Sequence, residues 1–156
     1  MAYKSIHKKL QDLQELIVGD MPITRYLQFS IDRYDENGLV LSAPLAPNIN
    51  HRGTAFGGSI SMMATLAGYG MTLLLLEDFE VPYHIVVQKG NISFNKPVKN
   101  NFKVICSHPK RDNHDRFKSM FLHKGLGRIY QHCVIQEMGN NVDAVTFTGA
   151  YVAFRD

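Results

Sequence analysis

Cysteine is scarce in this chain, and its histidines are scattered. The two cysteines, Cys106 and Cys133, show no metal-ligand or redox spacing, so we interpret them as buried free thiols in a reducing compartment. None of the seven histidines has another at the i, i+4 spacing of a helical metal site, and we expect no metal. The N-terminal residues lack the apolar core of a signal peptide, which favours a cytoplasmic protein.

Charge is also limited and dispersed along the chain. Charged residues make up 20% of the sequence, the net charge is +3, and no cluster of lysine or arginine is present. This pattern argues against a nucleic-acid partner and suits an anionic small ligand such as a phosphorylated cofactor. With 156 residues, the sequence fits a single domain spanning residues 1–156, large enough to bury a core.

A charge-free run from Ile60 to Leu76 follows a glycine-rich loop. Residues 57–76 are long enough to span a membrane, but they contain several hydroxyl and glycine residues. They also lack a basic flank, and Glu77 and Asp78 follow directly. We therefore expect a central core helix over residues 57–76 and no membrane partner.

The remaining patterns predict one amphipathic helix, a hairpin and a series of strands. We expect an N-terminal helix over residues 1–19, because Ile6, Leu10, Leu13 and Ile17 recur at the spacing of one helix face and Gly19 is placed to end it. The Asn37-Gly38 pair predicts a hairpin turn. Strand patterns cover residues 27–31, 39–43, 84–95, 102–108, 128–138 and 142–154, and a short helix capped by Asp112 or Asn113 presents Phe117, Met120 and Phe121.

These elements define an α+β protein. About six strands and one wholly apolar helix predict a curved antiparallel sheet wrapped around that helix. One sheet cannot cover every side of the helix, so we expect the remaining face to meet a second subunit in a homodimer or higher homo-oligomer.

The loop before the central helix is the most informative motif. A glycine-rich turn there presents unpaired backbone N–H groups at a helix N-terminus, where a developing oxyanion is stabilised. The pattern Asn-x-x-Gly-x-x-His-Gly-Gly is matched here by Asn50, Gly53, Gly57 and Gly58. Phe56 stands at the position of its histidine. In this respect the chain resembles the hotdog-fold thioesterases.

Two further matches extend that resemblance over nearly the whole chain from about Pro22. They are the segment 92–98, which ends in Pro97-Val98, and Gly127-Arg128 at the start of a long strand. The loop is most similar to thioesterase-like domains that some relatives fuse to an N-acetyltransferase domain. The resemblance implies a hotdog fold and a thioester of coenzyme A (CoA) or acyl carrier protein (ACP) as substrate, with no cofactor required.

Three residues are candidates for catalysis. We expect the Gly58 N–H to polarise the thioester carbonyl, Asn50 to orient water or the carbonyl, and Thr65 to assist from the helix. Each also has a structural interpretation: Gly57 and Gly58 allow close packing, Asn50 ties down its loop, and Thr65 bonds to a helix carbonyl. Thr65 stands where many relatives carry Asp or Glu, so the general base stays unassigned.

Other residues are candidates for binding. Gly57, Ser61, Met62 and Phe56 are expected to contact the substrate, with Met62 and Met63 lining an adaptable acyl channel. Lys96 and Arg128 are expected either to reach the phosphates of the cofactor portion or to lie solvated on the surface. His51 is a weak candidate for the base, and Glu77 is too far along the helix. A non-catalytic module that binds acyl thioesters is the alternative function, and a hotdog dehydratase ranks last.

Overall fold

The computed structural model describes residues 5–156. Its first element, α1 (Ile6–Asp20), begins where the Ser5 side chain accepts a hydrogen bond from the Lys8 N–H. Leu10, Leu13 and Ile17 are buried, as the predicted apolar face requires, whereas Ile6 in the first turn is 43% exposed, contrary to the prediction. The predicted end at Gly19 is wrong, because that residue lies within the last turn of the helix.

The chain between α1 and the sheet differs from the prediction. A 3₁₀ helix, η1 (Pro22–Leu27), occupies the start of the expected strand, and Gln28 then adopts a left-handed conformation with φ 52°. Strand β1 (Ser30–Asp35) therefore begins after Leu27 rather than at it. Proline at the start of η1 fixes φ and favours a tight helical turn, which returns the chain from α1 to the sheet.

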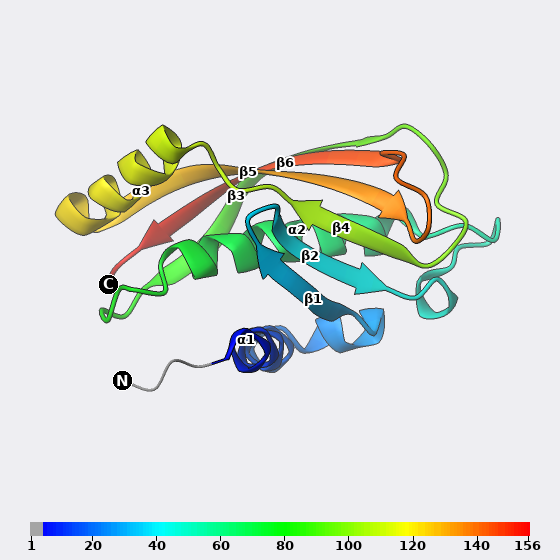
Figure 1. Cartoon of the computed structure of the whole chain (residues 1–156), viewed down its shortest axis with the longest axis horizontal. Helices are drawn as coiled ribbons and strands as arrows, with labels where there is room; N and C mark the ends of the chain where they lie inside the picture. Colours follow the sequence, from blue (N-terminus) through cyan, green and yellow to red (C-terminus); the bar gives the residue numbers. More distant parts are fainter. Residues whose placement is uncertain (1–4) are drawn as a thin grey trace.

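Within residues 5–156, six strands form one antiparallel sheet, as expected, and their order in the sheet is β1-β2-β4-β5-β6-β3 (Figure 1). Strands β1 and β2 form the hairpin predicted at Asn37-Gly38. Strand β3 stands at one edge and, in the part of the chain that the structure describes, pairs only with β6. The other strands are β2 (Gly38–Ala43), β3 (His84–Phe94), β4 (Phe102–Cys106), β5 (Leu126–Glu137) and β6 (Val145–Phe154).

Helix α3 (Arg111–Lys124) precedes β5 and lies against one end of it (Figure 1). Its N-cap is Lys110, whose side chain makes no capping bond, so the predicted cap at Asp112 or Asn113 is wrong. Asp112 instead lies in the first turn, where a carboxylate still favours the positive end of the helix dipole. Phe117 and Phe121 are fully buried, as their spacing predicts.

The central helix, α2 (Gly57–Leu75), packs against strands β2 to β6, with Leu76 as its C-cap. It is the only helix in the described part of the chain that is long and apolar enough to cross a membrane, and 67% of its most apolar stretch is buried in the protein. Beyond the first turn, one face of α2 is only half-buried. This face, here called the α2 stripe, consists of Ser61, Met62, Thr65, Tyr69 and Leu73.

Candidate functional site

The loop leading into α2 is held by hydrogen bonds from two asparagines. The Asn50 Oδ1 atom accepts from the N–H groups of Arg52 and Thr54 at 2.9 and 3.1 Å, and its Nδ2 donates to the Thr54 hydroxyl at 2.9 Å. Asn50 therefore ties the loop together, as its structural interpretation predicts. Its amide retains one N–H that none of these bonds uses.

Asn48 is a structural residue that the sequence analysis missed. Its buried side chain donates to the carbonyls of Leu27 and Pro44, at 2.9 and 2.8 Å, and its own carbonyl accepts from the Phe56 N–H. These bonds fix the loop to η1 on one side and to the start of α2 on the other. Sequence spacing gave no signal for this role, because its partners lie up to 21 residues away.

The first turn of α2 exposes backbone N–H groups. The first helical bond runs from the Ile60 N–H to the Phe56 carbonyl, and the Phe56 side chain cannot cap the helix. Among the described residues, no group accepts a hydrogen bond from the N–H of Gly57, Gly58 or Ser59 outside the helix. These amides, together with the helix dipole, make the N-terminus of α2 favourable for an oxyanion.

Phe56 covers this turn from one side. A Cβ atom built on Gly58 would lie 2.3 Å from the Phe56 Cε1 atom, so the ring packs directly against the Gly58 backbone. The Phe56 side chain nevertheless remains 55% exposed, and Gly58 is also exposed. Close packing thus explains why glycine stands here, and it leaves this turn open to a ligand.

A cleft of about 300 Å³ opens beside this turn. It brings together Asn50, Gly57 and Lys96, three of the residues selected from the sequence. Phe94 and Asn95, which the sequence analysis missed, also line it, and the Phe94 ring lies against Gly57. Their position just before Lys96-Pro97, where β3 ends, was the available signal.

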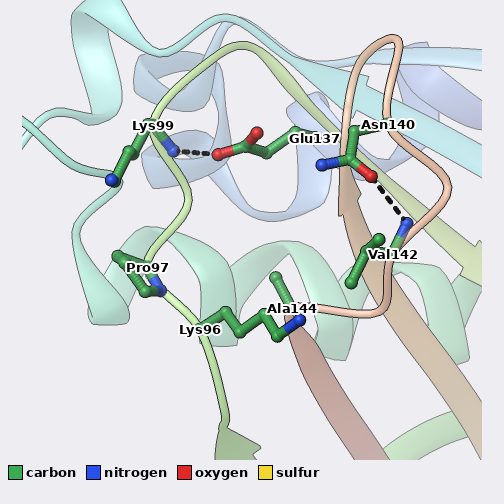
Figure 2. A pocket seen from close by; sticks show the side chains of 7 residues that line it. All are labelled: Lys96, Pro97, Lys99, Glu137, Asn140, Val142 and Ala144. Carbon is green, nitrogen blue, oxygen red and sulfur yellow. Dashed lines mark hydrogen bonds between the residues drawn. The ribbon is translucent and has the colours of Figure 1, made fainter.

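A second cavity of about 250 Å³ adjoins the first and shares Lys96 and Pro97 with it (Figure 2). Glu137 is the carboxylate that lines it, on the opposite side from Lys96. The Glu137 Oε1 atom accepts from the Lys99 backbone N–H at 2.6 Å. Glu137 was not selected from the sequence, since the residue it binds is 38 positions away.

The hydroxyl groups on α2 are bonded within the helix. Ser61 donates to the Gly57 carbonyl and Thr65 to the Ser61 carbonyl, each at 2.8 Å. Neither hydroxyl therefore has a free proton to donate, although both oxygens can still accept a hydrogen bond. Ser61, Met62 and Thr65 lie on the half-buried α2 stripe, so the structure places these three selected residues on one open face of the helix.

Arg128 lies away from the cleft within one chain. Phe94, Val145 and Ile135 are neighbours across the sheet near Gly57. Arg128 precedes Ile135 by seven residues of β5, or about 23 Å of strand. Arg128 and Lys96 therefore do not share a cavity in a single subunit.

The remaining candidates for chemistry are accounted for elsewhere. His51 is exposed, and Glu77 forms an ion pair with Lys9. Cys106 and Cys133 face each other across β4 and β5 as buried free thiols, where the hydrogen bond with Cys106 and burial raise the pKa of Cys133. No group of metal-binding side chains occurs within residues 5–156.

Comparison with protein families gives one match. Residues 10–155 fit the YiiD_C family model, which is described as "Putative thioesterase (yiiD_Cterm)". This match extends over nearly every element described above.

Solved structures share the same fold. A protein of unknown function from Chlorobaculum tepidum TLS is 29% identical, with a TM-score of 0.89 over 96% of both chains. A protein from Shewanella oneidensis, named "putative thioesterase", is 27% identical, with a TM-score of 0.83 over 95% of this chain and 99% of that one. A thioesterase from Haemophilus influenzae is 14% identical, with a TM-score of 0.69 over 94% of this chain and 90% of that one. At this identity the likeness shows the fold alone. The α+β architecture is thus the hotdog fold.

Proposed function

Because the chain belongs to the YiiD_C thioesterase family, we propose that it hydrolyses an acyl thioester of CoA or ACP at the N-terminus of α2. The observation that carries this proposal is the exposed Gly58 turn beside a cleft that contains Asn50, Gly57 and Lys96. Backbone donors at such a turn are rigidly placed and need no reorganisation as charge develops on an oxygen atom.

The thioester carbonyl oxygen accepts a hydrogen bond from the Gly58 N–H. Water adds to the carbonyl carbon, the resulting oxyanion stays on that donor, and the C–S bond then breaks. The products are a carboxylic acid and the free thiol, which takes up a proton. One such donor is worth about 2.7–4 kcal/mol in the transition state.

The neighbouring side chains position the substrate in this scheme. Asn50 holds the loop in shape and offers its one unused N–H to the carbonyl or to water. The Thr65 oxygen accepts a hydrogen bond from water, since its own proton is bonded to Ser61. Met62 and Phe56 form the apolar surface for the acyl chain, and the Lys96 ammonium attracts a phosphate of the carrier.

A second copy of the chain completes the site in this proposal. Strand β3 offers a long edge that no strand in the described chain covers, and it exposes Val86, Val87 and Phe94 at 47%, 47% and 52%. Edges of this kind are normally paired or protected. A homodimer joined through β3 would cover this edge and enclose the α2 stripe, and a carboxylate of the second subunit could then serve as the base.

Hydrolysis of acyl-CoA substrates of graded chain length tests the proposed activity. Thiol release should exceed the uncatalysed rate for at least one chain length, and the same acyl group on ACP should identify the preferred carrier. Binding without turnover of any substrate would contradict hydrolysis. It would favour the alternative, a non-catalytic module that binds acyl thioesters.

The dimer can be tested separately by sedimentation. We expect the native chain to be a dimer at micromolar concentration and the Val86→Glu, Val87→Glu double variant to be a monomer. Like charges facing each other across paired strands are destabilising. A Leu122→Glu variant, also at an exposed apolar residue but on α3, should remain a dimer. A native chain that sediments as a monomer would exclude this assembly.

A further inference from the structure

A third, larger cavity lies at the other end of the sheet, between α3 and the first half of β5. Its volume is about 500 Å³, within the range of small-molecule sites. Arg116, Asn113 and Met120 line it from α3, and Leu126, Arg128 and Tyr130 line it from β5. It shares no residue with the cleft at the Gly58 turn.

The position of this cavity follows from the unequal lengths of two strands. Strand β4 ends at Cys106, which pairs with Cys133, so within residues 5–156 no strand pairs with β5 on that side before His132. The last backbone hydrogen bond between the β4 side and β5 runs from the Ser107 N–H to the His132 carbonyl. Because backbone groups alternate in direction along a strand, Arg128 and Tyr130 point their N–H and C=O groups toward this same open edge.

Two arginines, Arg116 and Arg128, line this cavity, and neither has an acidic partner among the described residues. Within the described residues, no ion pair involves Arg116 or Arg128, and the nearby Asp115 pairs with Arg111 at 3.8 Å. Two unpaired guanidinium groups in one cavity, next to free backbone N–H groups, are suited to bind phosphate through paired hydrogen bonds.

The rest of the lining suits a planar or apolar group attached to that phosphate. The Tyr130 ring is 52% exposed and Leu126 is 49% exposed, while Met120 adds a flexible apolar side chain. An exposed tyrosine ring can stack on a nucleic-acid base, and the Asn113 amide can both donate and accept hydrogen bonds. Positive charge, an aromatic surface and an amide thus occur together in one cavity.

From this combination we propose that the cavity between α3 and β5 binds a phosphorylated nucleotide through Arg116 and Arg128, with the base against Tyr130. This site goes beyond thioester hydrolysis, because nothing in its lining depends on the Gly58 turn. The same chemistry is present in a free nucleotide and in the nucleotide portion of a CoA thioester.

Calorimetric titration with adenosine 3′,5′-bisphosphate tests the site. The native protein should bind it, and Arg116→Gln and Arg128→Gln should each weaken binding roughly tenfold or more through loss of a charged hydrogen bond. Arg25→Gln removes an arginine of η1 that is also exposed, and it should leave binding unchanged. Tyr130→Ala should weaken binding of the nucleotide while leaving binding of inorganic phosphate unchanged.

Absence of binding to the native protein, or equal binding by Arg116→Gln and Arg128→Gln, would overturn the proposal. Thioester kinetics on the same variants identify the source of the nucleotide. A raised KM for acyl-CoA in Arg128→Gln means that the cavity holds the CoA nucleotide, and an unchanged KM means that it holds a free one. Because binding is measured without a thioester, an inactive protein would still give a result for this site.

Discussion

Replacing Gly58 with proline should lower kcat for thioester hydrolysis by about 10²–10³-fold, compared with alanine at the same position. Proline removes the N–H group that we assign to the oxyanion, whereas alanine keeps it. A helix tolerates proline in its first turn, where the N–H has no helical partner, and Gly57 has no Cβ to clash with the ring. The expected loss is in kcat rather than in KM, because the oxyanion forms only in the transition state.

Both substitutions need space that Phe56 now occupies, so they are made in a Phe56→Ala background. Without the ring, the new side-chain atoms no longer meet the Phe56 Cε1 atom 2.3 Å away. The two double variants then differ mainly in one backbone N–H group. Thermal unfolding should show that both are folded. Equal kcat values for the proline and alanine variants would exclude the Gly58 amide as the oxyanion donor.

Replacing Gly38 with alanine should destabilise the protein by roughly 2–6 kcal/mol. Gly38 has φ 118°, a conformation that residues with a side chain rarely adopt. A Cβ atom there would also lie 2.1 Å from the Cys106 carbonyl oxygen, a backbone atom that cannot turn aside. The strain and the contact act together, and separating β2 from β4 would disturb the centre of the sheet.

Gly139→Ala is the matched control for this prediction. Gly139 also has a positive φ, 79°, but a Cβ atom there would have no neighbour within 4 Å. Its substitution should therefore cost only the conformational strain, about 1–2 kcal/mol. Urea denaturation measures both free energies of unfolding. Similar losses for the two variants would mean that the contact with Cys106 contributes little.

Local patterns in the sequence were sufficient for the main elements. The spacing of Leu10, Leu13 and Ile17 predicted the buried face of α1, and the charge-free segment predicted α2. The Asn37-Gly38 pair predicted the hairpin. Such signals involve neighbours within a few residues, so they do not depend on the rest of the fold. The need to cover one wholly apolar helix then predicted that the sheet wraps around it, and the resemblance to hotdog proteins implied the same fold.

The errors occurred where a local signal competed with packing. The alternation of Leu27, Phe29 and Ile31 predicted one strand, and all three residues are buried, but Leu27 is buried from a 3₁₀ helix. Gly19 and Asp112 are residue types that commonly end or cap helices, yet α1 continues past the first and α3 begins before the second. Helix ends depend on where the chain meets its neighbours, and residue type alone does not give this information.

The sequence by itself determined that this protein has a buried apolar helix, a glycine-rich turn before it and a sheet of about six strands, because periodicity and turn residues act over short distances. Only the tertiary structure decided which residues share a cavity. It placed Lys96 and Asn50 in one cleft and brought Glu137 to the backbone of Lys99. It placed Arg128 in a different cavity, with Arg116, at the open edge of β5. The reason is physical: strand order and the early end of β4 are set by packing between distant segments, which leaves no periodic trace in the chain.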